Sequence, residues 1–206
     1  MTKKKRYGIY VTALLIAVIT PIAGFGLSPL TRYSIITLAL AGAALVYRGH
    51  TYNDPPPAPS TKTLGLYITL ITLIGICGQV AMYYISTVHT DNAHDAVRDT
   101  ISSSPPAITL LYMFLIAPVC EEIIFRGVGY PLLRNKFSPW VAALLVSLVF
   151  ALLHGNITQG VTAFAISIPL CFLYEKTGRV APGIAAHILA NMCGTIAVAI
   201  ATGITG

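Results

Sequence analysis

Residues 107–128 read AITLLYMFLIAPVCEEIIFRGV and combine an apolar run with two glutamates and an arginine. Crossing the hydrocarbon layer takes about 20 mostly apolar residues in a helix, so the stretch predicts a transmembrane helix. A charged side chain at the bilayer centre costs about 3 kcal/mol on insertion scales. Glu121, Glu122 and Arg126 therefore need partners inside the protein or a function that retains them.

The rest of the chain is also strongly apolar. Hydrophobic residues make up 55% of its 206 residues and charged residues only 10%, which is typical of an integral membrane protein and not of a soluble domain. Further apolar runs lie at 7–27, 31–47, 64–87, 139–155, 157–174 and 182–204. We expect an all-α, polytopic transmembrane helical bundle of about seven spans, forming a single integral membrane domain over residues 1–206.

The basic residues predict the orientation of this bundle. The first run has a basic head but no small-residue cleavage site after it, so we interpret it as a retained anchor and not a signal peptide. With a cytoplasmic N-terminus, only Arg32 and Arg98 lie outside, as the positive-inside rule requires. The cytoplasmic residues are then Lys3, Lys4, Lys5, Arg6, Arg48, Lys62, Arg134, Lys136, Lys176 and Arg179. This topology explains the net charge of +6 without a nucleic-acid partner.

Two other sets of side chains are weaker candidates for a site. Four cysteines lie in predicted spans without disulfide or zinc spacing, and we interpret them as packing residues: Cys77, Cys120, Cys171 and Cys193. The outer loop at 88–106 holds possible metal ligands, although a solvated loop is the favoured interpretation: His89, Asp91, His94 and Asp95.

Helical geometry separates the two adjacent glutamates. Glu122 and Arg126 are four residues apart, so they can pair along one helix face. Glu121 points about 100° away from Glu122. A salt-bridge network that only holds helices together would account for Glu122 and Arg126, but it leaves Glu121 unexplained.

Two later spans carry further polar side chains. His154 ends one of them with Phe150 one turn before it, and the last span places His187 and Asn191 four residues apart on one face. Counted at about 1.5 Å per residue from the cytoplasmic ends, Glu121 and His154 both lie about 22 Å deep. His187 and Asn191 lie shallower by this count, at about 12 and 18 Å, so a tilted or kinked neighbour has to bring them together. Pro118 is expected to kink the span that carries the glutamates and to free backbone carbonyls there.

A carboxylate, two imidazoles and a carboxamide in one polar pocket favour hydrolysis. A desolvated glutamate can act as a general base on water, and a histidine can orient that water. A second histidine and an asparagine can donate hydrogen bonds to the oxyanion of an attacked amide. Ser147 and Ser167 have no base at a recognisable spacing, and no G-x-S-x-G elbow occurs. The residues therefore favour direct attack by water.

Three motifs, on three intramembrane segments in this order, resemble those of the CPBP family, which includes CAAX proteases, bacteriocin-processing enzymes and abortive-infection proteins. The resemblance covers about residues 107–200, the expected catalytic core, and no motif position departs from the pattern. The motifs are Glu121-Glu122-x-x-x-Arg126, Phe150-x-x-x-His154 and His187-x-x-x-Asn191.

The resemblance implies a glutamate-type intramembrane endopeptidase of the cell membrane, with a polar cavity open to the cytoplasmic side. It implies that Glu121 and His154 activate the water and that His187 and Asn191 stabilise the oxyanion. The implied supporting residues are Glu122, Arg126 and Phe150.

The expected partners are the lipid bilayer and a peptide or protein substrate that is prenylated or membrane-associated. A prenylated C-terminal peptide, a bacteriocin leader, a signalling peptide and a juxtamembrane segment all remain candidates. We expect no cofactor and no metal. Zinc is the less favoured alternative, because the chain lacks HExxH and an asparagine suits an oxyanion donor better than a zinc ligand.

Two other functions compete with proteolysis. In a proton-coupled transporter, Glu121, His154 and His187 would form a proton relay, although no inverted repeat or pair of broken helices supports one. In a non-catalytic membrane scaffold or immunity protein of the same fold, replacing Glu121 would leave the function intact.

Overall fold

The computed structural model describes residues 37–38, 41–42, 57, 59–88, 105–154 and 157–201. The predicted span at 7–27 and most of that at 31–47 lie outside the described residues. The same holds for the possible metal ligands of the outer loop, His89, Asp91, His94 and Asp95.

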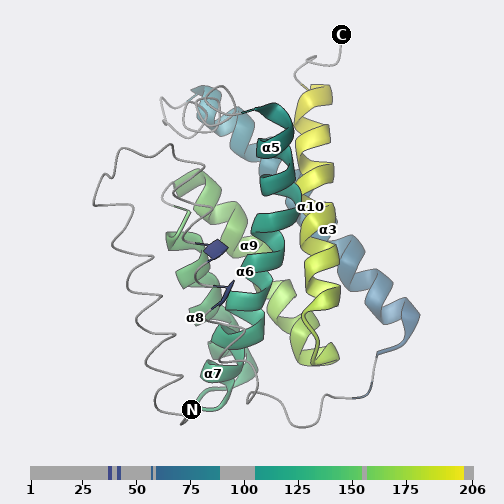
Figure 1. The fold of residues 1–206 in the computed structure, drawn as a ribbon, viewed down its shortest axis with the longest axis vertical. Coiled ribbons are helices and arrows are strands. Elements are labelled where there is room, and N and C mark those ends of the chain that lie inside the picture. Colours follow the sequence, from purple (N-terminus) through teal and green to yellow (C-terminus); the bar gives the residue numbers. More distant parts are fainter. Residues whose placement is uncertain are drawn as a thin grey trace.

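The described part of the chain is a bundle of helices without a strand (Figure 1). Four of its helical segments are long and apolar enough to cross a membrane: Thr61–Ile85, Ala107–Arg134, Ile157–Thr177 and Ala181–Ala201. A polytopic helical membrane bundle is therefore confirmed. The segment predicted as a span at 139–155 is a shorter apolar helix, α8, of 14 residues from Pro139 to Leu152.

The glutamate span consists of five consecutive helical pieces. They are α5 (Pro106–Leu111), the π-helical η1 (Tyr112–Ile116), α6 (Ala117–Ile124), the π-helical η2 (Phe125–Gly129) and α7 (Tyr130–Arg134). Pro118 and Pro131 each follow a π-helical piece closely. A proline ring clashes with the carbonyl four residues earlier. In each piece the next amide instead reaches back five residues, from Ala117 to the Tyr112 carbonyl and from Tyr130 to that of Phe125, which widens the turn where the ring needs room.

Three of the other helices flank this span. α6 runs between α10 (Ala181–Ala201) on one side and α8 with α9 (Ile157–Thr177) on the other (Figure 1). α3 (Thr61–Val88) packs against α10 and α9. Buried apolar side chains of the span, α8 and α9, including Val128, Val146 and Cys171, form one core. Ile71, Leu170 and Ala190 belong to a second core between α3, α9 and α10.

A tight turn fixes where the last helix begins. α9 ends at Thr177, and Gly178 follows with a φ of 60°, a left-handed conformation that suits glycine. Its amide donates to the Tyr174 carbonyl at 2.7 Å, and the Thr177 hydroxyl accepts from the Arg179 amide at 3.3 Å. α10 therefore starts close to the end of α9 and returns alongside the glutamate span.

Candidate active site

Glu122 and Arg126 form the ion pair that their spacing predicts. Arg126 Nη1 lies 2.8 Å from Glu122 Oε1, and both side chains are fully buried. Arg126 Nη2 also donates to the carbonyl and hydroxyl oxygens of Ser167, at 3.0 and 2.7 Å. A buried charge is tolerated only when it is paired and hydrogen-bonded. The Ser167 contacts satisfy Arg126 and connect η2 to α9.

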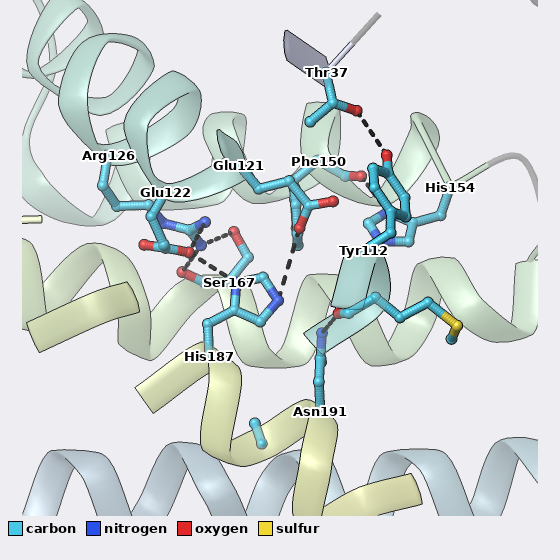
Figure 2. Close-up of polar contacts among 12 residues, drawn as sticks. Thr37, Tyr112, Glu121, Glu122, Arg126, Phe150, His154, Ser167, His187 and Asn191 are labelled. Carbon is cyan, nitrogen blue, oxygen red and sulfur yellow. Dashed lines mark hydrogen bonds and ion pairs between the residues drawn. The ribbon is translucent and has the colours of Figure 1, made fainter. Parts of the chain in front are cut away.

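His187 lies between the two adjacent glutamates (Figure 2). Its Nδ1 is 3.0 Å from Glu122 Oε1, and its Nε2 is 3.7 Å from Glu121 Oε2. Gly183, in the first turn of α10, permits this approach, because a Cβ there would lie only 2.8 Å from Glu122 Oε2. The site thus joins α6 and α10 through a single imidazole.

His187 and Glu121 come together as the sequence analysis required of a tilted or kinked neighbour. Residue counts place His187 about 10 Å shallower, whereas its ring reaches both carboxylates directly. The counts start from the chain positions where the helices end, and these do not lie at one level. α10 begins beside Glu122, since Gly183 packs against its carboxylate.

Phe150 connects the three motifs through its ring. The ring centroid is 4.8 Å from that of His154 and 6.0 Å from that of His187, both edge to face. On the same ring, the guanidinium carbon of Arg126 lies 5.2 Å from the centroid, a cation–π contact. Phe150 is only 2% exposed, so its position fixes the two histidines and the arginine relative to one another.

His154 is oriented by its own helix. Its Nδ1 lies 2.8 Å from the Phe150 carbonyl, which leaves Nε2 free of that bond. Figure 2 shows the Glu121 carboxylate extending toward the space between His187 and His154. Within the described part of the chain, no hydrogen bond or ion pair joins Glu121 to His154.

Asn191 reaches the same region from the next turn of α10. Its Nδ2 lies 3.4 Å from the Met113 carbonyl in η1. Pro118 has no N–H to offer the carbonyls of the preceding turn. The carbonyl that Asn191 binds therefore lies where the sequence predicted freed backbone acceptors.

Two contacts near the site were not predicted from the sequence. From the sequence we considered Ser167 only as a nucleophile, yet its hydroxyl accepts a hydrogen bond from Arg126. A buried guanidinium needs acceptors, so a serine in a neighbouring apolar span could have been recognised as its partner. The Tyr112 hydroxyl lies 3.0 Å from Thr37 Oγ1 (Figure 2). Residues so far apart in sequence carry no common pattern that would pair them.

The metal-free chemistry expected from the sequence stays a prediction. Among the residues that the structure describes, no three His, Cys, Asp or Glu side chains gather so that they could hold a metal ion. Each nitrogen of His187 faces a different carboxylate, an arrangement that metal-bound histidines also show.

Comparisons with known proteins bear on the same segment. Residues 103–193 match the family model described as Type II CAAX prenyl endopeptidase Rce1-like. The "Putative membrane peptidase YdiL" of Bacillus subtilis is 28% identical over 127 residues, covering 62% of this chain and 51% of the relative. The "UPF0177 protein YbdI" of Lactococcus lactis is 26% identical over 129 residues, covering 59% of this chain and 70% of the relative.

The chain thus spans about half the length of the Bacillus protein. No solved structure matches it significantly. The matched segment contains all three motifs. The first and third motifs lie in helices that are long and apolar enough to cross a membrane, and the second lies at the end of the shorter apolar helix α8. The chain is a multi-pass integral membrane protein, and its residues 103–193 are similar to the Rce1-like family of CAAX prenyl endopeptidases.

Proposed function

We propose that the chain is an intramembrane endopeptidase that hydrolyses a peptide bond with water activated by Glu121 and His154. The observation that carries this proposal is the unequal pairing of two adjacent carboxylates. Glu122 is fully buried and bonded to Arg126 and His187. Glu121 keeps 24% of its side-chain exposure and faces His187 at 3.7 Å, too far for a direct hydrogen bond. It therefore keeps acceptor capacity for a water molecule.

Hydrogen-bond partners support a distinct task for each histidine. The Phe150 carbonyl can only accept, so His154 Nδ1 carries the hydrogen, and Nε2 of the neutral ring is a free acceptor for water. The ionised Glu122 carboxylate, which also accepts from Arg126, can only accept, so His187 Nδ1 is the donor in their contact. His187 Nε2, when protonated, can then donate to an oxyanion.

The reaction balances with these residues alone. Glu121 takes one proton from water, His154 Nε2 accepts a hydrogen bond from it, and the water oxygen bonds to the carbonyl carbon. The resulting oxyanion accepts from His187 Nε2 and from the second hydrogen of Asn191 Nδ2. The C–N bond then breaks as Glu121 returns its proton to the leaving amine nitrogen, giving a carboxylic acid and an amine.

The wider setting of the site belongs to the same proposal. The bundle has about seven spans, its N-terminus is cytoplasmic, and the catalytic residues face a polar cavity open to the cytoplasm. The chain acts as one domain without a metal, on a prenylated or membrane-associated peptide. The family description, which names a CAAX prenyl endopeptidase, supports this substrate class.

A comparison of peptide termini tests the proposal without knowledge of the substrate. A host lacking the gene is complemented with wild type, Glu121→Gln or Glu175→Gln at matched protein levels, and new termini in its membranes are identified by mass spectrometry. Glu175→Gln is the matched control, because Glu175 pairs with Arg134 at 2.9 Å, away from the motifs. We expect a set of termini that requires Glu121 and not Glu175.

Each outcome decides between functions. Termini lost only in Glu121→Gln would support proteolysis and identify the substrate. Identical termini from wild type and Glu121→Gln, with the cellular phenotype rescued by both, would reject proteolysis in favour of a scaffold. Loss of pH-driven solute flux in proteoliposomes of Glu121→Gln, without any change in termini, would favour a transporter.

A further inference from the structure

Gln79 of α3 contacts the turn of α10 that carries Asn191. Its Nε2 lies 3.4 Å from the Asn191 carbonyl and 3.5 Å from that of Ala190. Its Oε1 accepts from the Thr195 hydroxyl at 3.2 Å. One amide side chain thus uses both of its ends on consecutive turns of the neighbouring helix.

The backbones of the two helices approach closely around these contacts. A Cβ at Gly75 would lie 2.7 Å from that of Ala190, and a Cβ at Gly194 would lie 2.6 Å from the Gln79 side-chain carbon Cδ. Small residues on facing helices let transmembrane backbones approach and let polar groups bond across the interface. The Gln79 amide therefore fits a space that Gly194 leaves for it.

α3 lies outside the segment that matches the family model, which begins at residue 103. The sequence offered no motif in this span. Through Gln79, a helix that the motifs do not include contacts the turn that carries Asn191.

We propose that Gln79 is a positioning residue, which fixes the α10 turn so that the Asn191 amide points at the reacting carbonyl. This inference rests on the proposed protease function. Asn191 itself makes one side-chain hydrogen bond in the described part of the chain, the 3.4 Å contact with Met113. Its direction is consequently set by the turn that bears it, and an oxyanion donor misplaced by about 1 Å can lose about 100-fold in rate.

The test is a double-mutant cycle in the purified full chain, reconstituted in lipid nanodiscs. The substrate is a quenched-fluorescent peptide with the cleavage sequence found by the terminus comparison. Gln79→Met keeps the length of the side chain and removes its hydrogen bonds. We expect kcat to fall about tenfold with KM unchanged, because an oxyanion contact acts in the transition state.

Asn191→Ala is expected to lower kcat by about 100-fold or more. The kcat of the double variant should equal that of Asn191→Ala, because Gln79 would act only through the Asn191 amide. Independent losses that multiply, or a rise in KM alone, would overturn the inference. Thr72→Val is the matched control on α3, because Thr72 donates only within its own helix, to the Ile68 carbonyl at 2.9 Å. It should leave kcat and KM unchanged.

Thr195→Val provides a second variant in case Gln79→Met unfolds. It removes only the bond that Gln79 accepts, and we expect a smaller fall in kcat in the same direction. Unchanged kcat in a folded Thr195→Val, combined with an unfolded Gln79→Met, would make Gln79 a packing residue and reject positioning. If the purified wild type does not cleave the peptide, the protease function itself is rejected, and if Glu121→Gln cleaves it as fast as wild type, Glu121 is not the base.

Discussion

Two neighbouring glutamates occupy opposite environments in this site. Glu122 is enclosed by Arg126, His187 and Gly183, while Glu121 is partly exposed. Their positions on the helix explain the difference, because adjacent residues point about 100° apart and only one of them can face Arg126 on the next turn.

The first prediction contrasts substitutions of these two residues. Glu122→Gln leaves the buried Arg126 without a compensating charge, so we expect a loss of about 3–5 kcal/mol in unfolding free energy. Glu121→Gln should leave stability unchanged and abolish cleavage. Thermal unfolding in detergent measures the first effect, and equal melting temperatures for the two variants would contradict the proposed division of roles.

At the scale of elements, the approach of α10 to α6 depends on Gly183. Gly183→Ala places a methyl group 2.8 Å from Glu122 Oε2, which must displace either the carboxylate or the helix. Overpacking of this kind costs about 1–3 kcal/mol. We expect lower stability together with lower kcat, because His187 moves with α10.

Gly65→Ala is the matched control for this substitution. Gly65 lies in α3, and a methyl group added there would meet nothing within 4 Å. Alanine in a helix interior is favoured over glycine by about 0.5–1 kcal/mol. This variant should be slightly stabilised and fully active. A Gly183→Ala variant that behaves like Gly65→Ala would show that the close contact is not required.

The elements also show how far sequence reasoning extends. The helical spans and the Glu122–Arg126 pair follow from apolar length and from i, i+4 spacing, which are local properties. The Arg126–Ser167 contact and the level of His187 depend on how separate helices pack, which periodicity does not encode. The π-helical pieces were also unforeseen, although both prolines that follow them are visible in the sequence.

At the scale of the whole molecule, the end of α7 and the start of α10 should both face the cytoplasm. Arg134 and Glu175 join α7 to α9 near this end, at 2.9 Å. In a variant with all native cysteines replaced by alanine, Asn135→Cys and Arg179→Cys should react with a membrane-impermeant maleimide only from the cytoplasmic side. Pro105→Cys, before α5, should react only from outside. Labelling of all three from one side would reject this topology.

The two π-helical pieces have a rotational consequence. A turn that reaches back five residues instead of four contains one extra residue, which amounts to about 100° around the axis. With two such turns, the faces of the helix before Tyr112 and after Gly129 are rotated by roughly 200° relative to their positions in a regular helix. A helical wheel drawn through all of 107–134 misplaces one end. Deleting a single residue from either piece would scarcely change length or hydropathy, yet it would swing the carboxylates out of phase with the rest of their helix.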